Sequence, residues 1–281
     1  MNNNLGRDKV WDDAIWQEID KAVMAEVGRI RVAQKVFPGV AMPNASYVPA
    51  DIFDAKTMSI AEGQTKPFVE ISVEFPLTQT QVDNEATLMT GRTLARLATK
   101  SVALAEDLLF FQGADVKLPP EVKVVNRNST NGGLLGAAKK KVIEVQPLDP
   151  KKPGVYGEGT FKAVSKGISD LTVDAQPGPY ALILESAIYA DTYAPLPTTL
   201  VTTADRIIPL VTGGFYSTGT LPPSTGLLVS LGGDPTTVYL GQDAITAFTQ
   251  EDQDGNSRFR VFERVQIIAR DARAFVRLDF K

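Results

Sequence analysis

The 281-residue chain contains neither cysteine nor histidine. Without cysteine, disulfides, thiol nucleophiles and thiolate metal sites are excluded. Without histidine, a serine or cysteine triad loses its usual base, and zinc or non-haem iron loses its commonest ligand. Any catalysis would have to rest on carboxylates, lysine or tyrosine. We therefore expect a protein that is not an enzyme and that holds no metal.

The chain also lacks a strong excess of charge and a long apolar run. Its 29 basic and 33 acidic side chains leave a net charge of -4, which gives no general attraction to nucleic acid or to anionic membranes. No apolar stretch approaches the length of a membrane span, and the N-terminal MNNNLGRDKV is polar where a secretion signal would be apolar. We expect a cytoplasmic protein that binds neither nucleic acid nor membrane.

Two segments have the periodicity of amphipathic helices. The longer runs over 90–113, with Thr90 as its expected N-cap and Gly113 as its end. Its apolar stripe, which we expect a sheet or a second helix to cover, consists of Leu94, Leu97, Leu104, Leu108 and Phe111. The other helix runs over 12–32, with the stripe Trp16, Ile19, Val23, Val27 and Ile30. This second stripe either fills the protein's own core or leaves a groove for a partner peptide.

Strand patterns precede and follow these helices. The segments 47–60 and 67–77 predict a long hairpin with the polar tip AEGQTK, which is either covered or an arm for assembly, because open strand edges invite another chain. Further strands are predicted within 179–186, 227–248, 259–269 and 274–280. The turn EDQDGNS lacks the spacing of a calcium loop and predicts a hairpin. These patterns indicate an α+β protein with long loops.

Several segments together resemble one family, the encapsulins, which are bacterial and archaeal shell proteins with the fold of tailed-phage major capsid proteins. The segments are LGRD with WQEID, VEFPLTQTQVDN, AEDLLFFQG, GLL at 133–135, GPYALIL, VYLGQD and ARDARAFVRLDF. They occur in the family's order and span nearly the whole chain. The resemblance implies a self-assembling shell subunit that encloses a cargo enzyme.

The resemblance also implies an architecture, the Hong Kong 97 phage-type capsid fold with a peripheral domain, an axial domain and an extended loop. The peripheral domain would start with the N-terminal helix in 1–46, continue with the long helix in 78–129 and end with the C-terminal strands in 231–281. The extended loop would be 47–77 and the axial domain 130–230. Sixty or more copies would form an icosahedral shell, in which the loop of one copy pairs with its neighbour.

Two sites follow from the resemblance alone. A short C-terminal peptide of the cargo, a peroxidase or a ferritin-like enzyme, would bind an apolar groove. The candidate residues of this cargo site are Val27, Ile30, Arg31, Gln34, Val36, Tyr239 and Ile245. Arg31 would hold a backbone carbonyl or a carboxylate, and Val27→Glu would release cargo from intact shells. The five-fold pore would be lined by Leu196, Pro197, Thr198 and Thr199.

Two departures from the family and two alternative functions remain. Family members associated with flavin have a tryptophan where this chain has Gln79, Thr80 and Gln81, so we expect no flavin. The segment 114–131 is longer than the family's pattern, and the sequence gives no account of it. The alternative to an encapsulin is a tailed-phage or prophage capsid protein. An enzyme is disfavoured by the missing histidine and cysteine.

Overall fold

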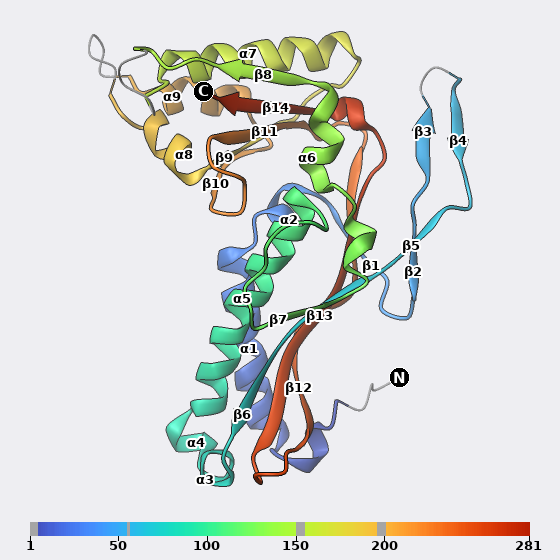
Figure 1. Ribbon diagram of the computed structural model, residues 1–281, viewed down its shortest axis with the longest axis vertical. Helices are drawn as coiled ribbons and strands as arrows, with labels where there is room; N and C mark the ends of the chain where they lie inside the picture. The colour runs from blue at the N-terminus through green and yellow to red at the C-terminus, as the bar shows by residue number, and fades with distance from the viewer. Residues whose placement is uncertain (1–4, 55–56, 150–154, 196–200) are drawn as a thin grey trace.

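The computed structural model describes residues 5–54, 57–149, 155–195 and 201–281. It is a mixed α+β structure, as the sequence predicts (Figure 1). The helices in these residues are α1 (Asp13–Ile30), α2 (Ala33–Val36), α3 (Gln79–Asp83), α4 (Glu85–Leu88), α5 (Thr90–Gln112), α6 (Gly133–Ala137), α7 (Glu158–Val173), α8 (Ser186–Thr192) and α9 (Thr203–Ile207).

The strands form two five-stranded sheets and two short hairpins. The first sheet has the order β1-β12-β13-β6-β7 and the second β10-β9-β11-β14-β8. The first sheet consists of β1 (Gly39–Ala41), β6 (Val69–Leu77), β7 (Val122–Val125), β12 (Thr236–Glu251) and β13 (Ser257–Ala269). The second consists of β8 (Val142–Val145), β9 (Tyr180–Glu185), β10 (Gly214–Thr218), β11 (Thr225–Ser230) and β14 (Phe275–Phe280). The hairpins pair β2 (Tyr47–Pro49) with β5 (Thr65–Pro67) and β3 (Ile52–Asp54) with β4 (Ser59–Ala61).

The long-sheet region comprises the first sheet together with α1 and α5. Strands β12 and β13 form its longest antiparallel pair, and the turn between them confirms the predicted hairpin. In that turn, the Asp252 carboxylate accepts hydrogen bonds from the amides of Asp254 and Asn256, each within 3.0 Å. These local bonds hold the pKa of Asp252 below its ordinary value. The carboxylate therefore stabilises the turn itself.

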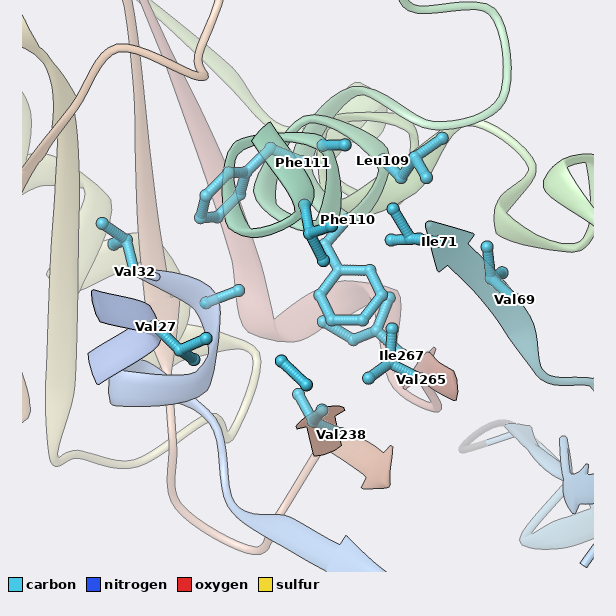
Figure 2. Close-up of a cluster of buried hydrophobic side chains, with 14 of the residues drawn as sticks. Val27, Val32, Val69, Ile71, Leu109, Phe110, Phe111, Val238, Val265 and Ile267 are labelled. Atoms are coloured by element: carbon cyan, nitrogen blue, oxygen red, sulfur yellow. The ribbon is translucent and has the colours of Figure 1, made fainter. Parts of the chain in front are cut away.

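Helices α1 and α5 pack on each other and on one face of this sheet (Figure 1). Figure 2 shows the resulting core, where Val27 of α1, Phe110 of α5 and Val238 of β12 point toward one another. The apolar stripe predicted for the first helix faces this core, with Trp16, Ile19, Val23 and Val27 buried and Ile30 half-buried. The core therefore fills most of that stripe.

The buried face of α5 differs from the predicted stripe. Of the predicted stripe, Phe111 is buried, Leu94 and Leu108 are half-buried, and Leu97 and Leu104 are exposed. The buried side carries the small residues Ala95, Ala98 and Ala105 together with larger ones such as Leu109 and Phe110. Small side chains let the helix lie close to α1 and the sheet. The spacing of large apolar residues therefore did not identify the whole side of α5 that makes this contact. Leu97 and Leu104 of the predicted stripe are left facing outward.

The ends of α5 are also set by contacts outside the helix. Met89, with a φ of 53°, occupies the N-cap position that we expected for Thr90. Its first free amides, those of Gly91 and Arg92, donate instead to the Glu85 carboxylate, at 2.6 and 2.9 Å. At the other end Gly113 stops the helix as predicted, because its φ is 88° and a Cβ there would lie 2.1 Å from the Asn131 carbonyl oxygen.

The short-sheet region comprises the second sheet with α7, α8 and α9. Alternate residues of its strands serve two cores: Ile183 and Leu227 join the core of the long-sheet region, whereas Leu182 and Leu228 pack in a separate cluster with α7. The terminal strand β14 lies here, between β11 and β8. This differs from the expectation that the strands of 231–281 lie together in a peripheral domain, because the chain crosses between the sheets after β13.

The two short hairpins form an extended arm, residues 47–67, which we call the ribbon (Figure 1). The ribbon confirms that this segment forms a hairpin. However, its first strand, β2, pairs with β5 and not with the segment 67–77 that we predicted. Residues 69–77 form β6, which pairs with β13 and β7 inside the long-sheet region. Its alternating pattern reflects a strand buried on one face, and alternation does not identify the neighbour.

The segment 114–131 adds a strand to the edge of the first sheet. This strand, β7, lies beside β6. Arg127 donates to the carbonyl oxygens of Ala114 and Val116, which closes the segment into a loop. Ser101 on α5 donates to the Glu121 carboxylate at 2.6 Å. The extra length thus extends the sheet alongside α5.

Candidate functional site

The seven residues of the predicted cargo site do not share one surface. Val27 and Val36 are buried in the core of the long-sheet region. Tyr239 belongs to a different cluster, with Val48 and Phe68, at the base of the ribbon. Its neighbour Val238 faces the α1 side, and because side chains alternate along a strand, Tyr239 faces the opposite side of the sheet. Tyr239 is therefore separated by the sheet from Val27.

Arg31, at the C-terminal end of α1, lies at the centre of a buried ionic cluster. It is 3% exposed, and each of its three side-chain nitrogens is paired with a carboxylate: Nε with Glu106 of α5 at 2.5 Å, Nη1 with Asp243 of β12 at 2.7 Å, and Nη2 with Glu263 of β13. Gln34 joins the cluster by donating to Glu106 at 2.8 Å. Arg31 therefore joins helix and sheet, and its nitrogens are already occupied.

Asp107, the next residue on α5, holds the start of α2. Its two carboxylate oxygens accept hydrogen bonds from the amides of Val32 and Ala33, at 2.8 and 2.9 Å. Burial and the neighbouring Glu106 carboxylate raise the pKa of Asp107 to about 7, although both amides and Arg31 oppose the shift. Burial likewise raises the pKa of Glu106. Acidic groups thus outnumber the single guanidinium of this cluster.

The sequence did not identify these carboxylates as partners of Arg31. A signal for them was present, since Glu106 and Asp107 are adjacent acids within the apolar AEDLLFF segment. Acids at such positions are rarely buried without a partner. The partners themselves lie 75 to 232 positions apart in the chain, so pattern analysis could not pair them.

Ile30, Gln34 and Ile245 are the cargo-site candidates that keep partial exposure. The pore candidates Leu196, Pro197, Thr198 and Thr199 lie outside the described residues. Just before them, Tyr189 and Tyr193 of the α8 segment pack with Phe215, and their hydroxyl groups are 3.0 Å apart. This aromatic group marks the end of the short-sheet region that leads to the predicted pore segment.

The ribbon exposes apolar side chains on strands that, in its described residues, pair with each other and with no strand of the two sheets. Ile52, Phe53, Met58 and Ile60 are all exposed, and β3 and β4 form a two-stranded hairpin. Two contacts attach the ribbon to the body of the chain. At its base, Val48 is buried against Tyr239 and Ile268, and on β3 the Phe53 amide donates to the Arg270 carbonyl oxygen at 3.4 Å. An isolated two-stranded hairpin is marginally stable in water, so this surface is suited to contact a further chain.

None of the helices in the described parts of the chain is both long and apolar enough to cross a membrane.

Comparison with known proteins identifies the family. Residues 2–266 match the model of a family described as encapsulating protein for peroxidase. Among curated proteins, none matches the chain by sequence.

Solved structures with the same fold include shells and capsids. A virus-like particle from Pyrococcus furiosus superposes with a TM-score of 0.70 at 15% identity, covering 94% of this chain and 99% of that one. The SrpI encapsulin from Synechococcus elongatus PCC 7942 gives 0.57 at 10% identity, covering 87% and 85%. The capsid of Myoviridae phage XM1 gives 0.57 at 8% identity, covering 89% and 91%. The predicted phage-type capsid fold is thereby confirmed.

Proposed function

Since the chain belongs to the family of encapsulating proteins for peroxidase, we propose that it is the subunit of a closed shell that encloses a cargo enzyme and carries out no chemistry itself. Sixty or more copies would form an icosahedral particle in the cytoplasm. Closure makes each subunit hold several neighbours, so modest interfaces together give a persistent particle.

The exposed ribbon is the observation that carries this proposal. It presents Ile52, Phe53 and Ile60 to solvent on a hairpin that the body of the same chain contacts at the base of the ribbon and through the Phe53 amide. Covering these side chains with a neighbouring subunit would remove apolar surface from water and supply partners for open strand edges. A closed particle is the arrangement in which every copy obtains such a cover.

Assembly is tested with a ribbon variant and a matched control. We expect Phe53→Asp combined with Ile60→Asp to abolish particles, measured by light scattering and negative-stain electron microscopy, while the chain stays folded by circular dichroism. Val173→Asp, at an exposed site near the end of α7, is the control and should leave particles intact. Monomers of the unaltered chain, or particles that survive both ribbon substitutions, would contradict the proposal.

For the cargo we propose a peroxidase or ferritin-like enzyme, bound through a short C-terminal peptide near the exposed parts of Ile30 and Gln34. Ile245 is not part of this surface, because its strand neighbour Ala244 faces the core beneath the helices and Ile245 therefore faces the other side of the sheet. The buried candidates Val27, Arg31 and Val36 would support this surface from beneath, whereas Tyr239 lies across the sheet from it. Because Val27 lies in the core, Val27→Glu would place a charge there and would not separate cargo binding from folding. Ile30→Glu is the better test.

The cargo experiment co-expresses the shell with a fluorescent protein that carries the C-terminal tail of a peroxidase or ferritin-like enzyme from the same genome. We expect particles to retain the fluorescence through gel filtration and Ile30→Glu to reduce it at least about tenfold. Gln17→Glu adds the same charge at an exposed site of the same helix and should change little. Equal retention in both variants would remove Ile30 from the site.

The alternative function, a tailed-phage capsid protein, is favoured by the likeness to the phage XM1 capsid. The two functions differ in what the particle holds. Particles purified with an enzyme inside and no nuclease-protected DNA support the encapsulin, and protected DNA supports the phage capsid.

A further inference from the structure

Two hollows adjoin along the outer side of the α1 and α5 helix pair. The first, about 350 Å³, lies between α1 and the α4–α5 turn and has apolar walls made by Ala14, Ile15, Ala86 and Met89. The second, about 330 Å³, continues between the helices and is lined mainly by charged side chains. Glu18 and Arg92 line both hollows. Together they form one continuous groove, which we call the helix-pair groove.

The charged part of this groove has an excess of cations. The basic side chains that line it are Lys21, Arg29, Arg92 and Arg96, and the acidic ones are Glu18 and Glu26. Lys100, the next cation along α5, pairs with the same Glu26. The four positive and two negative groups of the lining leave a local charge of +2 on a chain whose net charge is -4. A concentration of positive charge on an acidic protein favours an anionic partner at this place.

The cations are only partly compensated by their own carboxylates. Glu26 is buried beneath Arg29, Arg96 and Lys100, at 3.7, 3.4 and 3.6 Å. One carboxylate is thus shared by three cations, each with a side chain at least half exposed. Their remaining donors face solvent and can bind further acceptors.

The apolar part of the groove carries little free negative charge. Glu85, which lines it, uses its carboxylate to accept hydrogen bonds from the amides of Gly91 and Arg92. Exposed Leu88 and Met89 lie next to this hollow in the chain, and exposed Leu97 lies farther along α5. The surface therefore combines an apolar anchor site with a row of cations.

We propose that the helix-pair groove binds an extended acidic segment of a partner protein, with one apolar side chain in the apolar hollow and acidic side chains along Arg92, Arg96 and Lys100. The spacing suits this occupant. Along a helix, the eight positions from Arg92 to Lys100 span about 12 Å. Four residues of an extended segment span about 13 Å, so acidic residues at alternate positions face successive cations.

The apolar hollow favours a peptide over a nucleic acid. Single-stranded nucleic acid is usually held by aromatic side chains that stack on the bases. The described residues that line the two hollows include no aromatic side chain. A peptide supplies both an aliphatic side chain for the hollow and carboxylates for the cations, so the one occupant matches both parts.

The test uses a defined probe in cells that produce the full chain. A fluorescent protein carries the C-terminal tail Gly-Ser-Leu-Glu-Ser-Glu-Ser-Glu, and the control tail has lysine in place of each glutamate. We expect the acidic tail to co-purify with the chain and the lysine tail not to. Arg92→Glu with Arg96→Glu should lower retention of the acidic tail at least about tenfold and should favour the lysine tail.

Matched variants distinguish the groove from general charge. Lys162→Glu with Lys166→Glu reverses two exposed cations on α7 and should leave retention unchanged. Ala86→Leu fills the apolar hollow without changing charge and should also reduce retention. Equal retention of both tails, or no effect of the Arg92 and Arg96 reversals in a folded chain, would overturn the proposal.

Two further outcomes are decisive. Nuclease-sensitive nucleic acid that co-purifies with the chain and is lost in the Arg92 and Arg96 variant would show a different occupant and overturn the proposal. Particles that form normally but do not retain the acidic tail would also overturn it, while leaving the shell function intact. The proposal does not depend on the proposed shell, because the probe is scored on the chain in whichever state it is purified.

Discussion

The long-sheet region and the ribbon differ in how far they bury apolar side chains. In the long-sheet region, Phe110 is 0% exposed and Arg31 is surrounded by carboxylates. In the ribbon, Phe53 is 41% exposed and its hairpin has contacts mainly at its base. Buried groups stabilise the fold of the single chain, whereas exposed apolar groups gain free energy only when another surface covers them. Substitutions in the two regions should therefore affect different measurements.

The largest effect on the long-sheet region is expected from Arg31→Ala. Removing the guanidinium leaves Glu106 and Glu263 buried without their cation, and breaking a buried ion pair in this way costs about 3–5 kcal/mol. Urea unfolding followed by circular dichroism measures the loss. Arg273→Ala is the control, because the Arg273 side chain is 44% exposed and its pair with Asp271 should contribute at most about 1 kcal/mol. Similar losses in both variants would contradict the structural role of the cluster.

The comparison between regions is sharpest for the pair Phe110→Ala and Phe53→Ala. The first leaves a cavity in the core and should lower the free energy of unfolding by about 3–5 kcal/mol. The second should change it by less than about 0.5 kcal/mol in the unassembled chain, since the ring is already exposed. Phe53→Ala should instead reduce particle yield in gel filtration. If it destabilised the unassembled chain as much as Phe110→Ala, the distinction between the regions would be wrong.

The buried carboxylates predict a pH dependence specific to the long-sheet region. The pKa of Asp107 is raised from an ordinary value near 3.8 to about 7, so the folded chain holds a proton that the unfolded chain releases. The stabilising contribution of that proton is full below about pH 4 and is lost as pH rises through about 7.

Asp107→Asn tests this dependence. It removes the titrating group, so the decrease in unfolding free energy from pH 5 to 7.5 should become smaller by about 2 kcal/mol. Parallel urea titrations at these two pH values measure the difference. An unchanged slope would mean that Asp107 is already ionised throughout this range in the folded chain.

The smallest effect is expected on the outward side of α5. Leu97→Ala should change the free energy of unfolding by less than about 0.5 kcal/mol, because the side chain is 60% exposed. Leu109→Ala, on the buried side of the same helix, should cost about 2–5 kcal/mol. Thermal unfolding of the two variants compares them directly. A larger loss of stability for Leu97→Ala than for Leu109→Ala would mean that the predicted stripe, and not the observed face, is the buried side of α5.

The sequence by itself determined the class of elements and much of their placement. The absence of histidine and cysteine can be seen in the composition. The helical spacing in α1 and the turn at Asp252 could be predicted because each depends on residues that are close together in the chain. The order of weak motifs also identified the family and its fold.

Only the tertiary structure decided which surfaces meet. Periodicity gives the faces of a helix, but packing buried Ala98 and Leu109 of α5 and left Leu97 exposed. Alternation shows which side chains of a strand share a face, but it does not show that β6 pairs with β13. Nor does it show that Tyr239 and Val27 lie on opposite sides of the sheet. Arg31 finds its carboxylates on three other elements. Such pairings depend on packing between distant segments, for which the local pattern carries no signal.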